Sequence, residues 1–168
     1  MALVRVSFSD LDALERKMRT VAEEATTIAK FAVYDGAKIA ADALRVSTNA
    51  LQAVSDYDAI NAKRRGERTY ISYKQKAGLQ AHLGIAHMHV TSDSVDTRVS
   101  FGGMNAVVTP RWPKGQPNIM VAAEVNYGTS GRTIRQPFVT VAEELYRQDI
   151  LNAMVRTATA KITEILDS

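Results

Sequence analysis

Apolar positions near the start of the chain recur at alternating spacings of three and four residues. The members of this seam are Leu11, Leu14, Met18, Val21, Ala25, Ile28 and Ala32. Because such spacing places every member on one side of an α-helix, it predicts a long helix with a narrow apolar face. An alanine-rich stretch follows the seam and leaves room for another backbone to come close.

The boundaries of this helix are suggested by its flanking residues. Leu3–Phe8 alternates between apolar and polar positions, which predicts a short strand before the helix. Ser9 can cap a helix that begins near Asp10, and the alanines continue the pattern to about Leu44. Gly36 lies inside the pattern, where it costs about 1 kcal/mol relative to alanine and can allow a kink. We therefore expect a helix from about Asp10 to about Leu44, with a kink near Gly36.

Residues 46–75 show no clear periodicity. They contain many residues that favour loops, namely Ser47, Thr48, Asn49, Ser55, Asp56, Asp58, Asn61 and Gly66. The pattern predicts a long irregular connection. Such connections inside one domain are usually functional, or stay disordered until a partner binds.

The middle of the chain predicts short elements. Leu79, Leu83 and Ile85 favour a short helix over Gln75–Ile85. Alternating residues then predict two paired strands, Ile85–Val90 and Val95–Ser100, around a turn at Ser92–Ser94. Prolines and glycines make 105–115 a loop.

The last third combines an apolar stretch, a turn and a long helix. The apolar stretch Asn118–Tyr127 is consistent with a buried strand ending at Tyr127, or with a short helix leading into a strand at Glu124. Gly128–Gly131 has the composition of a turn, and Pro137 suits the first turn of a helix. An apolar stripe then runs to the end of the chain through Leu145, Leu151, Met154, Val155, Ala158, Ile162 and Ile165.

This order of elements predicts an α+β fold, with an antiparallel or mixed sheet packed by a long N-terminal helix and a C-terminal helix. The length of 168 residues suits a single domain, 1–168, with a long basic loop at about 46–75. No run of about 18 apolar residues predicts a membrane span, and the N-terminus does not resemble a signal peptide. The chain has no cysteine, so disulfides and thiolate metal sites are excluded.

The positive charge is concentrated in one segment. The whole chain has a formal net charge of +3, but residues 63–76 contain six basic residues and one acidic residue. The candidate contact residues there are Lys63, Arg64, Arg65, Arg68, Tyr70, Tyr73 and Lys74. Basic side chains can contact phosphates and tyrosines can stack on exposed bases, which would give non-specific nucleic-acid binding. The alternative is a solvated loop that pairs with acidic residues of a neighbouring protein.

Other chemical motifs are weak. His87 and His89 share one face of a predicted strand near Asp93 and Asp96, but two histidines at this spacing also suit an exposed edge strand. Residues 128–131, Gly-Thr-Ser-Gly, are one residue too short for a nucleophile elbow. Because no phosphate loop, dinucleotide fingerprint or zinc-protease motif occurs, we expect no enzymatic activity, no cofactor and no metal.

Four segments, in order, resemble one family of proteins. They are A-G-L-Q-A-H-L-G-I at 77–85, V-D-T-R-V-S-F-G-G at 95–103, G-Q-P-N-I-M-V-A-A-E-V-N-Y-G-T-S at 115–130, and R-Q-P-F-V-T-V-A-E at 135–143. Together with the strand and long helix of residues 3–45, they resemble the tail-component proteins (tail-completion, minor tail or head–tail joining) of long-tailed bacteriophages. Residues 46–76 lie outside the resemblance. The family often has glutamate directly before its aromatic-Gly-Thr, where this chain has Asn126.

The resemblance implies a structural virion protein at the head-proximal end of a phage tail, assembled in the host cytoplasm. It would complete the tail or join tail to head in the neck, as part of a ring with six-fold symmetry as the expected form. Its implied partners are further copies of itself and neighbouring connector, tail-terminator or tail-tube proteins, with non-specific contact to DNA in the lumen. The family-motif residues, with an expected role in a turn or subunit contact, are Glu124, Tyr127, Gly128, Thr129, Gln136, Pro137 and Phe138.

Two further expectations accompany this resemblance. A loop at 53–74 that is mobile in the free protein would become fixed on assembly. The alternative function is a small nucleic-acid-binding protein that uses the basic 63–76 segment.

Overall fold

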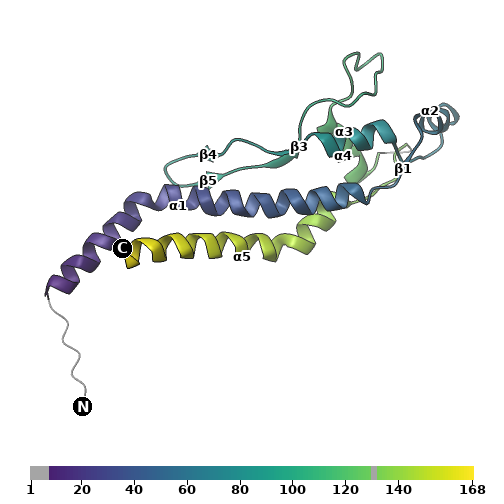
Figure 1. The fold of residues 1–168 in the computed structure, drawn as a ribbon. Coiled ribbons are helices and arrows are strands. Elements are labelled where there is room, and N and C mark those ends of the chain that lie inside the picture. The colour runs from purple at the N-terminus through teal and green to yellow at the C-terminus, as the bar shows by residue number, and fades with distance from the viewer. Residues whose placement is uncertain (1–7, 130–131) are drawn as a thin grey trace.

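Two long antiparallel helices form an arm, and smaller elements gather around one end of it (Figure 1). The computed structural model describes residues 8–129 and 132–168. The arm consists of α1 (Phe8–Asn49) and α5 (Phe138–Asp167). We call the smaller elements the head. The strand expected at Leu3–Phe8 lies outside the described residues, apart from Phe8, which begins α1.

The head is built from short helices and strands. Their bounds are β1 (Ala53–Val54), α2 (Asp56–Arg65), β2 (Ile71–Ser72), α3 (Tyr73–Ala81), β3 (Leu83–Ile85), β4 (His89–Val90), β5 (Val95–Asp96), β6 (Val99–Phe101) and α4 (Asn118–Tyr127). Within the described residues, the strands form three separate pairs rather than one sheet. β1 pairs parallel with β2, while β3 with β6 and β4 with β5 are antiparallel. The structure confirms the α+β class, and no described helix is long and apolar enough to span a membrane.

The β4–β5 hairpin extends from the head along the arm (Figure 1), and α1 contacts β3, β5 and β6. The expected strand pair is therefore confirmed, but each strand is interrupted and shorter than the sequence pattern indicated. The short helix is also confirmed, as α3, although it begins at Tyr73 and ends before Leu83. The 105–115 segment is a loop, as expected.

Gly36 lies where the two long helices touch. A Cβ atom added at Gly36 would lie 2.7 Å from Met154 Cγ on α5, which is closer than real side chains approach. The glycine therefore allows close packing of α1 on α5. α1 continues without interruption through this position and five residues beyond the expected end at Leu44.

The main hydrophobic core lies in the head. It consists of Leu51, Ile71, Leu79, Phe101, Val121, Ala122, Val125 and Phe138, all buried. A second, smaller cluster of Ala43, Leu44 and Ala142 joins the two long helices next to it. The core therefore sits where both long helices enter the head.

The expected irregular connection at 46–75 is wrong, because α2 and two strands occupy it. The Ser55 hydroxyl caps α2 by accepting a hydrogen bond of 3.0 Å from the Asp58 backbone N–H. Acidic residues lie in the first turn and basic residues in the last, as the helix dipole favours. Gly66 ends the helix with φ +72°, a conformation that glycine adopts without strain. The expectation that 53–74 becomes fixed on assembly stays a prediction, for a segment that contains β1, α2 and β2.

The strand expected to end at Tyr127 is also wrong. Residues 118–127 form the helix α4, and no strand begins at Glu124. The buried residues of α4 are Asn118, Val121, Ala122, Val125 and Asn126, spaced as one face of a helix. Gly128, with φ +76°, ends the helix, and Ser130 and Gly131 of the expected turn lie outside the described residues.

Candidate functional site

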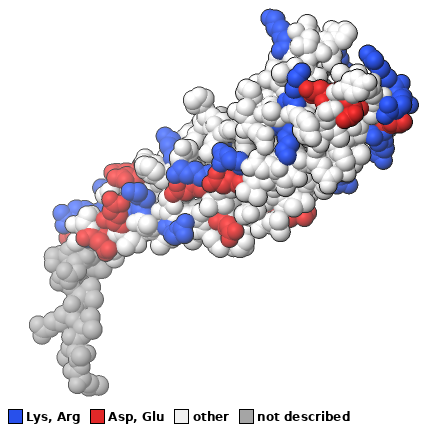
Figure 2. All heavy atoms as spheres, turned by 45° about the vertical axis from the view of Figure 1, so that its right-hand side comes forward, with Lys and Arg blue, Asp and Glu red and all other residues white. Residues whose placement is uncertain are grey.

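The basic segment lies at the end of the head that is farthest from the free end of the arm. Lys63, Arg64 and Arg68 are exposed there, at the end of α2 and just after it. Figure 2 shows lysine and arginine side chains gathered at this end of the molecule, with a few acidic side chains among them. We call the exposed set Lys63, Arg64 and Arg68 the basic tip.

Two other basic residues of the segment are paired with acids. Arg65 contacts Glu67 at 2.8 Å, and this hydrogen bond lowers the pKa of Glu67 below its ordinary value. Lys74 lies 3.4 Å from Asp56. Partial burial acts to raise the pKa of Asp56, but the nearby Ser72 hydroxyl and the Lys74 ammonium outweigh it and lower the pKa. Two of the six basic side chains of the segment are therefore engaged with acidic side chains.

Lys76 has an internal role. Its ammonium donates hydrogen bonds of 2.8 and 2.7 Å to the carbonyl oxygens of Asn49 and Leu51. The Asn49 carbonyl belongs to the last residue of α1 and the Leu51 carbonyl follows shortly after it. A positive charge at this end of a helix also suits the helix dipole. Of the two tyrosines, Tyr73 is exposed and Tyr70 is half-buried. The segment thus divides into an exposed basic tip and a part built into the head.

Gln136 of the family-motif set connects the segment that follows α1 with the segment that precedes α5. Its side-chain oxygen accepts a hydrogen bond of 2.8 Å from the Gln52 backbone N–H, and its amide donates one of 3.0 Å to the Gln52 carbonyl. The Gln136 backbone N–H also donates to the Val125 carbonyl at 2.8 Å. One side chain therefore ties the segment after α1 to the segment before α5.

Asn126 holds the first turn of α5. Its side-chain oxygen accepts hydrogen bonds from the backbone N–H groups of Val139 (3.0 Å) and Thr140 (3.2 Å), and its amide donates to the Thr140 hydroxyl at 3.1 Å. Pro137, directly before the helix, makes no side-chain cap. In the sequence, Asn126 stands out only as a departure from the family resemblance, although helical spacing places it on the buried face of α4.

The other motif residues divide between the interior and the surface. Phe138 is buried and packs on Phe101 with ring centroids 5.7 Å apart. The Thr129 hydroxyl accepts a hydrogen bond of 3.0 Å from the Thr133 backbone N–H, which shapes the turn after Gly128. Glu124 is half-buried, and Tyr127 is 72% exposed. Tyr127 is thus the motif residue best placed to contact another subunit, while the interior ones fix the entry to α5.

Backbone hydrogen bonds join the segment after the basic tip to the segment that leads into α5. The Thr69 backbone N–H donates to the Arg132 carbonyl, and the Ile134 N–H donates to the Thr69 carbonyl, both at 2.9 Å. Thr69 directly follows Arg68 of the basic tip. The tip is therefore anchored by backbone hydrogen bonds to the chain that leads into α5.

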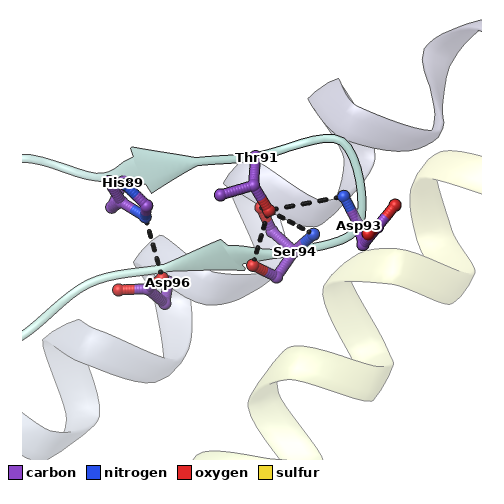
Figure 3. Close-up of polar contacts among 5 residues, drawn as sticks. All are labelled: His89, Thr91, Asp93, Ser94 and Asp96. Atoms are coloured by element: carbon purple, nitrogen blue, oxygen red, sulfur yellow. Dashed lines mark hydrogen bonds and ion pairs between the residues drawn. The ribbon is translucent and has the colours of Figure 1, made fainter.

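The histidines do not assemble into a metal site. Figure 3 shows His89 of β4 facing Asp96 of β5, with ring nitrogen and carboxylate 3.4 Å apart, and the turn held by Thr91 and Ser94. A ring nitrogen of His82 lies 3.0 Å from the Gly78 carbonyl oxygen. Among the residues that the structure describes, no group of three or more potential metal ligands is present.

Large apolar side chains are exposed on both helices of the arm. The exposed residues on α1 and α5 include Leu14, Met18, Phe31, Val46, Val141, Leu145, Leu151 and Val155. An apolar groove of about 460 Å³ lies between α1, α5 and the strands β5 and β6, lined by residues such as Val33, Ala40 and Val99. Exposed apolar side chains that lie together on a surface often mark a contact with another protein chain.

Comparisons of this chain with protein-family models, curated proteins and solved structures find no match.

Proposed function

We propose that this protein is a structural virion component at the head-proximal end of a long phage tail. In this role it completes the tail or joins tail to head, as one subunit of a ring, expected to be hexameric. The observation that carries the proposal is the exposed apolar surface of the arm. A protein whose longest helices expose leucine, valine and phenylalanine side chains is suited to assembly with other chains.

Three further features support this function. Asn126 and the family-motif residues Gln136 and Phe138 hold the head on the arm, which suits a subunit that must keep one shape within an assembly. Tyr127 is exposed beside them and can reach a neighbouring subunit. The basic tip offers a contact to acidic groups of another ring or to DNA in the lumen.

The test is particle assembly with and without this protein. We expect particles made without the chain to accumulate as separate heads and tails, or as tails that lack a proper end, in electron micrographs. Addition of the purified protein should restore joined particles and infectivity. Normal particles in the absence of the chain would contradict the proposal.

The second candidate function is non-specific nucleic-acid binding. It is favoured by the exposure of Lys63, Arg64 and Arg68 on one end of the head, and Tyr73 of the same segment is also exposed. The salt dependence of DNA binding distinguishes this function from assembly, because phosphate contacts weaken steeply as salt rises.

A further inference from the structure

α5 carries a second helical seam besides the one that packs on α1. Its positions are Val141, Leu145, Gln148, Asn152, Val155, Thr159, Ile162 and Leu166, spaced alternately by four and three residues. This spacing places all eight on one side of the helix. None is charged, although solvent-exposed helix faces are usually rich in charge. We call this set the outer seam.

The outer seam faces away from α1. The α5 residues that bury themselves in the arm, such as Ala142 and Ala153, lie on the opposite side of the helix from Val155. Leu145 is 69% exposed and Val155 65% exposed. A helix with apolar residues on two opposite sides is expected to be covered on both, and within the described residues only one side is covered.

We propose that the outer seam pairs with the outer seam of a second copy of this chain, with the two α5 helices antiparallel. Two exposed charges at the edge of the seam select this orientation. Along one edge of the seam, Asp149 precedes its midpoint, which lies between Asn152 and Val155, and Arg156 follows it. In an antiparallel pair, each Asp149 therefore lies beside Arg156 of the second copy, and the contact forms twice.

A parallel pair is disfavoured by the same charges. Glu144 lies along the other edge of the seam, and parallel pairing would place it beside Asp149 of the second copy, as in g–e′ contacts of coiled coils. Like charges at such positions destabilise a helix pair. The charge pattern thus favours one orientation and opposes the other.

The residues of the seam also match when it is reversed. The resulting pairs are Val141 with Leu166, Leu145 with Ile162, Gln148 with Thr159, and Asn152 with Val155. The two outer pairs are apolar, Gln148 meets a hydroxyl, and the central pair joins a polar residue to an apolar one. Gln148 already donates a hydrogen bond of 3.0 Å to Asn152, so these amides are partly satisfied before pairing. Uncharged polar residues inside a seam commonly set its register.

This contact is independent of the proposed virion function. An isologous pair joins two copies about a two-fold axis and does not itself close a ring, which needs a different, heterologous surface. The antiparallel pair is therefore tested by experiments that do not depend on the virion function.

The first experiment measures self-association by analytical ultracentrifugation. We expect wild-type protein to dimerise, and Leu145→Glu or Val155→Glu to raise the dissociation constant at least about tenfold, because each buries an unpaired charge in the contact. Circular dichroism should show unchanged helix content, since both side chains are exposed in one copy. Val108→Glu, at a 66% exposed apolar residue of the 105–115 loop, is the matched control and should dimerise like the wild type.

Charge reversal tests the orientation without changing the apolar residues. Asp149→Arg and Arg156→Asp should each weaken dimerisation, and the double variant should restore it. A wild-type protein that stays monomeric, seam variants that dimerise normally, or a double variant weaker than both single ones would each overturn the proposal.

Spin labels measure the orientation directly. Because the chain has no cysteine, single labels can be placed by Asn152→Cys or Leu145→Cys. In an antiparallel pair, the two labels at 152 are offset by only about 5 Å along the helix axis, and those at 145 by about 25 Å. A short distance at both positions would indicate a parallel pair and contradict the inference.

Discussion

Asn126 supplies from another helix the cap that the start of α5 lacks. Its side chain satisfies two backbone N–H groups in the first turn of α5, while Pro137 makes no side-chain cap. The first N–H groups of any helix have no partner within the helix. Because Asn126 is only 1% exposed, water cannot easily replace it. The start of α5 therefore depends on α4.

Replacement of Asn126 with alanine should lower the free energy of unfolding by about 1–3 kcal/mol, because buried N–H groups lose their partner. Chemical denaturation monitored by circular dichroism measures the change. Gln80→Ala is the matched control, because it removes a hydrogen bond to Asn49 that is exposed, and we expect a change within about 0.5 kcal/mol. Equal effects of the two variants would show that Asn126 is not a cap.

The contacts of single residues were harder to predict from the sequence than the helices and strands. The sequence marks Lys76 as a basic residue beside Lys74, but its role depends on the carbonyls at the end of α1, more than 20 residues earlier. Gln136 likewise depends on Gln52. Local patterns contain no information about such distant partners, so the sequence could not reveal these internal hydrogen bonds of Lys76 and Gln136.

Polar contacts link the two long helices inside the arm, and one of them is a hydrogen bond of 2.6 Å from the Lys17 ammonium to the Leu166 carbonyl. The Thr157 hydroxyl of α5 donates a hydrogen bond of 2.8 Å to the Asp35 carboxylate of α1. A hydrogen bond from Lys38, and then the one from Thr157, lower the pKa of Asp35 below its ordinary value, against a small opposing effect of burial. The ionised carboxylate therefore stabilises the pairing of the helices.

Because of this contact, we expect the stability of the protein to depend on pH. Because the folded-state pKa of Asp35 is lowered, its stabilisation is present above the unfolded pKa of about 3.8 and is lost as pH falls through the folded value. Thr157→Val should weaken the protein by less than about 1 kcal/mol near neutral pH, since Asp35 is partly exposed. The difference from wild type should shrink below pH 4.

Denaturation curves at several pH values between 2 and 7 measure this difference. Thr26→Val, at an exposed threonine of α1, serves as the control for loss of a hydroxyl. A difference between wild type and Thr157→Val that stays constant down to pH 2 would exclude the assigned role of Asp35.

Among elements, the long helices were predictable and two short ones were not. The three- and four-residue spacing identified α1 because it extends over many turns. The sequence does not predict α2, because Ser55 and Gly66 favour loops, although they are its two caps. For α4 the sequence allows either a strand or a short helix leading into a strand, and the spacing of its buried residues from Asn118 to Asn126 favours a helix throughout.

At the scale of the whole molecule, charge is distributed unevenly between the two ends. The basic tip lies on the head, whereas basic and acidic side chains are mixed along the arm (Figure 2). Under the assembly function we expect weak binding of duplex DNA, with a dissociation constant above about 1 micromolar at physiological salt. Submicromolar affinity would instead favour the nucleic-acid-binding function.

Combined replacement of Lys63, Arg64 and Arg68 with glutamine should abolish most of this binding. If all three contact phosphates, the slope of log affinity against log salt should fall in magnitude by about 3. Arg16, Arg19 and Lys30, which are exposed on the arm, provide a control triple replacement with the same change in charge. Equal loss in both triple variants would show that only net charge matters.

The arrangement of the arm also determines how the protein responds to mechanical load. The described start of α1 and the end of α5 lie at the same end of the arm, away from the head (Figure 1). A force that pulls these two ends apart acts across the helix pair and separates it turn by turn, so that few contacts resist at any moment. A force applied between the head and the free end acts along the helices and loads their contacts together. The same helix pair is therefore weak against peeling and strong against stretching.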